Sequence, residues 1–128
     1  MPFNYELTDR VVQFHPKGEV LQEMNLQGMT EALTAVRAAW RTNGNRPFDL
    51  LIDLRESLEN RSAGELRSLA EFIAGYADVL TGRIAIVATD PLRYALARVF
   101  EVFSEHLGQT PRMFSDPADA EAWFAGEA

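Results

Sequence analysis

The feature that most constrains the fold is the stretch of residues 48–64, where an apolar run leads to an aspartate and then to a helix start. The unbroken apolar residues 50–52 predict a strand that is buried on both faces, as in the middle of a parallel sheet. A polar loop follows, and Ser62 and Glu65 then form the Ser-x-x-Glu pattern that opens a helix. This order predicts an α/β protein whose sites lie at the carboxyl ends of its strands.

Strand and helix patterns alternate along the rest of the chain. We expect strands at residues 5–7, 11–15, 48–54, 83–88 and 112–114, and helices at residues 26–42, 63–80, 91–107 and after Asp116-Pro117. Gly82 is expected to cap the second helix, and Pro111 favours an edge position for the last strand. The prediction is a single α/β domain over residues 1–128, with a mixed sheet of about five strands, four helices and the order ββαβαβαβα.

The predicted third helix is unusually apolar. Its expected inner face carries Leu92, Leu96, Val99, Phe103 and Leu107. Further apolar residues lie around the cylinder at Tyr94, Phe100 and Val102. Such a helix makes a wide core contact, forms a dimer face, or lines an apolar pocket.

Composition excludes several classes of function. The chain has 128 residues, of which 47% are hydrophobic and 24% charged, and its net charge is -7. That charge disfavours nucleic acid and anionic membranes as partners. There is no cysteine, so disulfides and thiolate chemistry are excluded. No apolar run approaches the ~20 residues of a membrane span, and the first residues lack the features of a signal peptide. We therefore expect a cytoplasmic protein.

Ser62 and Gly64 are candidate site residues at the predicted helix start. We favour a capping box in which Ser62 and Glu65 bind each other's backbone N–H groups, which requires no further function. Alternatively, Ser62 accepts a phosphate, which the helix N-terminus and Arg55 or Arg61 would stabilise. Gly64 weakens a first turn, so it indicates either close packing on a strand or close approach of a ligand or partner backbone.

Arg55, Arg93 and Tyr94 are expected at the carboxyl edge of the sheet, beside two helix N-termini. That position suits an anion or a lipid head group, although solvated arginines and a partly buried tyrosine are the simpler interpretation. The chain has no glycine-rich phosphate loop, so nucleotide binding has little support.

No catalytic or metal-binding pattern is visible in the sequence. Asp53 is expected to bind loop N–H groups, and a general base would need an acid or histidine that no recognisable spacing supplies. His15 and His106 are isolated, and the serines lack a Gly-x-Ser-x-Gly elbow. We expect no enzyme activity, no metal and no cofactor.

Three segments, together with the order of elements, give the chain a resemblance to a known family. They are residues 48–55, residues 83–88 followed by 90–92, and the C-terminal residues 112–114 and 120–123. The chain resembles the STAS domain of bacterial anti-sigma-factor antagonists, and more closely the SpoIIAA-like, or STAS/Sec14-like, group of small bacterial proteins. The resemblance covers nearly the whole chain.

The phosphorylation motif of the antagonists is not intact. In those domains a strand ending in aspartate leads to Asp-Ser-Ser-Gly, and a partner kinase phosphorylates the serine before the glycine. Asp53 and Gly64 keep that separation, but Ala63 precedes the glycine, Ser62 matches only the first serine, and Arg61 replaces the aspartate. The resemblance therefore implies the scaffold without the phosphorylation switch.

Two functions remain open from the sequence. The first is a non-enzymatic regulatory module that binds a protein partner through the surface of residues 55–64. The alternative is a small apolar-ligand or lipid-binding protein with a pocket beside the third helix. A homodimer is compatible with either function.

Overall fold

Strands and helices alternate in the predicted order, ββαβαβαβα. The structure is a computed structural model, and it describes residues 3–19 and 21–126. The strands are β1 (Phe3–Leu7), β2 (Val11–Pro16), β3 (Phe48–Asp53), β4 (Leu80–Val87) and β5 (Thr110–Phe114). The helices are α1 (Gln22–Thr42), α2 (Ala63–Ala74), α3 (Pro91–His106) and α4 (Pro117–Phe124). None of these described helices has both the length and the apolar character needed to cross a membrane.

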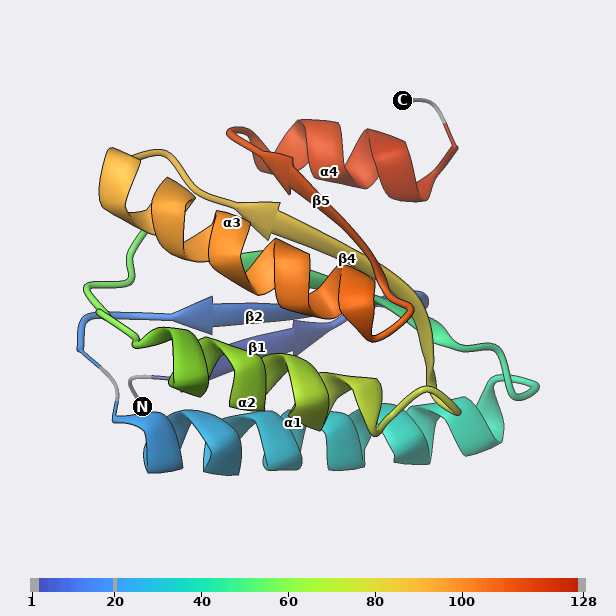
Figure 1. Cartoon of the computed structure of the whole chain (residues 1–128). Helices are drawn as coiled ribbons and strands as arrows, with labels where there is room; N and C mark the ends of the chain where they lie inside the picture. Colours follow the sequence, from blue (N-terminus) through green and yellow to red (C-terminus); the bar gives the residue numbers. More distant parts are fainter. Residues whose placement is uncertain (1–2, 20, 127–128) are drawn as a thin grey trace.

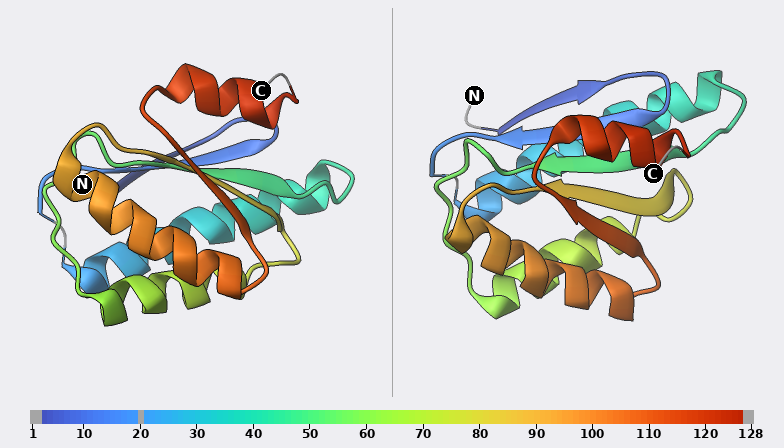
Figure 2. Two further views of the ribbon diagram at one scale, coloured as in Figure 1. Left: turned by 45° about the horizontal axis from the view of Figure 1, so that its top comes forward. Right: turned by 90° about the horizontal axis from the view of Figure 1, so that it is seen from above.

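The five strands form one mixed sheet in which the spatial order is the same as the chain order. β1 and β2 pair antiparallel, and β2 to β5 pair in parallel. Crossovers between parallel strands are right-handed, so three crossovers in one direction place their helices on the same face. α1, α2 and α3 accordingly cover one face, and α4 alone covers the other, over β3, β4 and β5 (Figure 1 and Figure 2).

The hydrophobic core has two parts, one on each face of the sheet. The larger part lies beneath α1 to α3 and contains Leu50 and Ile84, whereas the smaller part lies beneath α4 and contains Leu51 and Val87. Trp123 packs against the smaller part. Both faces of β3 are buried, which confirms the prediction of a central strand, and β5 is an edge strand, as Pro111 predicts.

The end of the second helix differs from the prediction. α2 ends at Ala74 because Gly75 forms its C-cap, and β4 already begins at Leu80. Gly82 is therefore not a helix cap. It lies inside β4 with a φ of 93°, where the register with β3 shifts, and glycine adopts that backbone conformation without strain.

The inner face of α3 is also rotated from the prediction. Its buried residues are Ala97, Phe100, Glu101 and Ser104, whereas the predicted Leu92, Val99 and Leu107 are exposed. The prediction assigned the large apolar residues of this helix to its buried face. Small residues such as Ala97 and Ser104 instead allow the helix to lie close to its neighbours.

α1 begins at Gln22, before the predicted residue 26. Its N-cap is Leu21, which makes no side-chain capping hydrogen bond, so the usual start signal is absent from the sequence.

Candidate functional site

The candidate site lies at the carboxyl edge of the parallel strands, where the loop of residues 54–62 meets the N-termini of α1, α2 and α3 (Figure 1). Backbone hydrogen bonds fix this loop to the end of β2. The Gly18 N–H donates to the Glu56 carbonyl and the Leu58 N–H donates to the Gly18 carbonyl, each at 2.9 Å. The six predicted site residues lie around this edge, but they divide between the two faces of the sheet.

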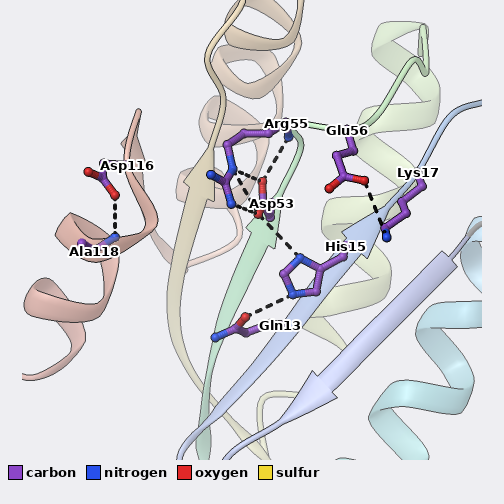
Figure 3. A network of polar contacts seen from close by, with 8 residues as sticks. All are labelled: Gln13, His15, Lys17, Asp53, Arg55, Glu56, Asp116 and Ala118. Carbon is purple, nitrogen blue, oxygen red and sulfur yellow. Dashed lines mark hydrogen bonds and ion pairs between the residues drawn. The ribbon is translucent and has the colours of Figure 1, made fainter.

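Asp53 is the centre of a polar network on the α4 face of the sheet (Figure 3). Arg55 donates from Nε to Oδ1 of Asp53 at 3.0 Å, and from Nη2 to Oδ2 at 2.8 Å. Its backbone N–H also donates to Oδ1, at 3.1 Å. His15 Nδ1 lies 3.6 Å from Oδ2, and His15 Nε2 is 3.1 Å from Oε1 of Gln13.

The prediction that His15 is isolated is therefore wrong. β2 and β3 are parallel with Gln13 opposite Leu51, so the strand ends place His15 beside Asp53. Separation in sequence concealed this pairing, because it depends on the register of two strands joined by α1.

The environment of Asp53 favours its charged form. Burial acts to raise the pKa of Asp53, but hydrogen bonds from Arg55 and the charges of Arg55 and His15 outweigh it and lower the pKa. A general base works best with a pKa near the working pH. Asp53 is thus suited to hold Arg55 and the loop backbone, in line with its predicted structural role.

Ser62 forms the predicted capping box at the start of α2. The Glu65 N–H donates to Ser62 Oγ at 3.1 Å, and the Ser62 N–H donates to Glu65 Oε1 at 3.0 Å. Gly64 is exposed, and a Cβ added there would meet nothing nearer than Ser62 Oγ at 4.0 Å. Close packing on a strand is therefore not the reason for this glycine.

The opposite face of the sheet contains an open pocket between the strands and α1 to α3. It encloses about 670 Å³ of empty space, a figure that includes open solvent at its mouth. About 70 Å³ of this space admits the centre of a water molecule, so the interior is narrow. Its apolar lining includes Phe14, Ile52, Leu69, Ile73, Ala97 and Phe100.

Five polar side chains also line this pocket, and they come from the loop of residues 54–62 and the first turns of α1 and α3. They are Asn25, Ser57, Glu59, Arg61 and Arg93. The three charged side chains are only 8–11% exposed. Arg61 Nη2 lies 3.3 Å from Glu59 Oε1, and Arg93 Nη1 lies 3.8 Å from Asp90 Oδ1.

The pKa of Glu59 lies above its ordinary value, although neighbouring arginines usually lower the pKa of a carboxylate. Burial raises the pKa of Glu59, and the attraction of Arg61 and Arg93 offsets only part of that effect. Asp53 and Glu59 thus lie near the same edge of the sheet with pKa values displaced in opposite directions.

The predicted site residues are only partly brought together. Arg61 and Arg93 line the same pocket, and Arg93 is not the solvated arginine of the simpler interpretation. Arg55 lies on the other face, paired with Asp53. Ser62 and Gly64 are exposed. Tyr94 is 52% exposed and lines a more open hollow together with Thr89 and Ser115.

Sequence reasoning missed Glu59 as a pocket residue. It lies in a polar loop between Asp53 and Ser62 that reads as solvent-exposed, and no spacing marks it. Its burial results from the way the loop folds over the mouth of the pocket, which only the tertiary structure reveals.

Across residues 3–19 and 21–126, no three His, Asp or Glu side chains come together as a group that could hold a metal ion. No protein-family model, no curated protein and no solved structure matches the chain significantly. Function therefore has to be argued from the chemistry of the site itself.

Proposed function

We propose that this chain is a non-enzymatic binding protein for a small apolar or amphipathic molecule, which it holds in the pocket beside α3. One observation carries the proposal. An open pocket with apolar walls reaches the sheet, and its polar lining residues come from the loop of residues 54–62 and the adjoining helix starts. Few polar groups in an apolar cavity are typical of small-molecule sites. The element order and the mixed sheet also support our proposal of a STAS-like, SpoIIAA-like scaffold.

Native mass spectrometry of gently purified protein tests the proposal. We expect a bound mass that organic extraction removes. Ala97→Leu places extra atoms in the pocket and should abolish the bound mass, because Ala97 is 2% exposed and lines the cavity. Ala95→Leu is the matched control, since Ala95 lies on the same helix with its side chain in solvent. A clean apo mass for the unmodified chain, together with no uptake of added alkyl ligands, would count against the proposal.

A second candidate function is the regulatory module that binds a cytoplasmic protein partner through residues 55–64. Exposed apolar side chains favour it, because Leu58 on this loop is 63% exposed and Leu21, at the start of α1, is 67% exposed. In this case Leu58→Glu should abolish co-purification of one defined partner, and Leu92→Glu on α3 should retain it. If Ser62→Asp changes no such contact, phosphorylation of Ser62 plays no part.

Homodimerisation is a related proposal. Leu92, Val99 and Val102 form an exposed apolar stripe along α3, at 46%, 37% and 49% exposure. Size-exclusion chromatography with light scattering should then report a dimer that Val99→Glu converts to a monomer. A monomeric mass for the unmodified chain at high concentration would exclude the dimer.

A further inference from the structure

Three charged side chains line the pocket, and they differ in how well they are paired. Glu59 supplies one carboxylate, whereas Arg61 and Arg93 supply two guanidinium groups, and all three side chains line the cavity. Glu59 and Arg61 form an ion pair with both side chains at least nine-tenths buried. Arg61 also lies 3.9 Å from Glu65, so within the described chain it has two carboxylate partners, whereas Arg93 has one at 3.8 Å.

Arg93 is the less well paired of the two arginines. Its side chain is 11% exposed, and its nearest acidic group, Asp90, is 3.8 Å away and 48% exposed. The buried Nε of Arg93 has no hydrogen-bond partner among the described residues. A buried cation is costly unless it is paired and hydrogen-bonded, so this arrangement is incomplete as it stands.

A bound anion would supply the hydrogen-bond partner that Nε of the Arg93 guanidinium group lacks among the described residues. A guanidinium group offers parallel N–H donors that match the two oxygens of a carboxylate. The apolar walls of the pocket, which include Ile52 and Leu69, suit a narrow alkyl chain behind such a head group. Glu59 disfavours a head group that carries more than one negative charge, because the Glu59 carboxylate would repel the second charge.

We propose that the pocket binds a single-chain aliphatic carboxylate, with its carboxylate on Arg93 and Arg61 and its alkyl chain along the apolar wall. This inference rests on the proposed function and specifies its ligand class. In this arrangement Glu59 competes with the ligand for the two arginines. The class includes fatty acids and other alkyl carboxylates.

The test compares three ligands with the same chain and different head groups: decanoate, 1-decanol and decyltrimethylammonium, each below its aggregation concentration. Isothermal titration calorimetry at neutral pH should give decanoate at least about tenfold higher affinity than decanol, since a charged hydrogen bond contributes more than a neutral one. The quaternary ammonium should not bind measurably, because it places a cation beside two arginines.

Two variants move the affinity in opposite directions. Arg93→Met should weaken decanoate binding by about 10- to 100-fold and leave decanol binding nearly unchanged. Glu59→Gln should strengthen decanoate binding severalfold, because it removes the competing carboxylate. Arg67→Met is the matched control, since Arg67 lies on the outer side of α2 with its side chain 66% exposed. Thermal melts of each variant verify that it is folded.

The outcomes separate the two proposals. If unmodified protein binds decanoate and decanol equally, the head-group inference is wrong and the apolar pocket stands. If it binds neither, the proposed function is wrong as well. The comparison of ligands on unmodified protein needs no variant, so it remains decisive even if Arg93→Met does not fold.

Discussion

Asp53 and Glu59 show how the surroundings of a single residue decide its role. Both are carboxylates near the end of β3, and both have an arginine partner. Asp53 receives hydrogen bonds from the side chain and backbone of Arg55, which hold it charged. Glu59 is held in the apolar pocket, where desolvation outweighs its arginines. The two residues therefore predict opposite dependences of stability on pH.

We expect Asp53→Asn to lower the free energy of unfolding by about 1 kcal/mol at neutral pH, a modest value because Arg55 is nearly half exposed. The folded pKa of Asp53 lies below its ordinary value of 3.8, so its charged form stabilises the fold above that pH. This stabilisation is lost as the pH falls through the folded pKa. Urea unfolding of both proteins across the acid range measures the difference, and a constant difference at every pH would contradict the prediction.

We expect Glu59→Gln to have the opposite effect. The folded pKa of Glu59 lies above its ordinary value of 4.5, so the folded chain loses stability as the pH rises from that value through the folded pKa. The variant should be more stable than the unmodified chain at neutral pH and equal to it in acid. Urea unfolding without added ligand measures this. A variant that is less stable at neutral pH would mean that Glu59 mainly neutralises Arg61 and Arg93.

At the scale of the elements, the start of α2 shows local chemistry that the sequence predicts well. The capping box involves residues three apart, so its geometry depends on little beyond the helix itself. The buried face of α3 and the pairing of His15 with Asp53 depend instead on how distant segments pack. The element order and the central position of β3 were predictable from periodicity. The charged lining of the pocket was not, because the loop that carries Glu59 and Arg61 reads as an ordinary polar connection.

Ser62→Ala should lower the free energy of unfolding by about 1 kcal/mol, because it removes the acceptor for the Glu65 N–H. Ser62→Asp should retain most of the stability, since aspartate also caps helices. Chemical denaturation compares the three proteins. If Ser62→Ala leaves the free energy of unfolding unchanged, a water molecule fully replaces the Ser62 hydroxyl as acceptor for the Glu65 N–H.

Gly64→Ala should raise the free energy of unfolding by about 0.5–1 kcal/mol, because alanine favours a helix and the added Cβ has open space. The same denaturation assay measures the change. A gain in stability with a loss of partner or ligand binding would show that Gly64 is kept for close approach of another molecule. A loss of stability would contradict the open space around this position.

At the scale of the whole molecule, the pocket lies within the larger part of the core, so binding and stability are linked. Several residues that line it, including Ile73, Ala97 and Phe100, also belong to that core. A ligand that occupies the cavity adds contacts that the empty core lacks. Thermal unfolding therefore reports on occupancy without knowledge of the natural ligand.

Decanoate at about 100 times its dissociation constant should stabilise the fold by about 2.7 kcal/mol, if it binds only the folded chain. Differential scanning fluorimetry measures the rise in melting temperature. Ala97→Leu should remove this rise, and Ala95→Leu should retain it, because only Ala97 faces the cavity. An equal rise in both variants would place the decanoate elsewhere.

The strands follow one another in the sheet in the same order as in the chain, and this affects how the protein folds during its synthesis. Each strand pairs only with its neighbours in the sequence, so a chain that emerges from the ribosome can add one strand at a time at a free edge. In the described sheet no strand has to enter between two that are already paired. The last addition is β5, whose Pro111 reduces the hydrogen-bonding capacity of the edge that remains. β5, an edge strand of the described sheet, therefore has one backbone N–H donor fewer than its length would otherwise give.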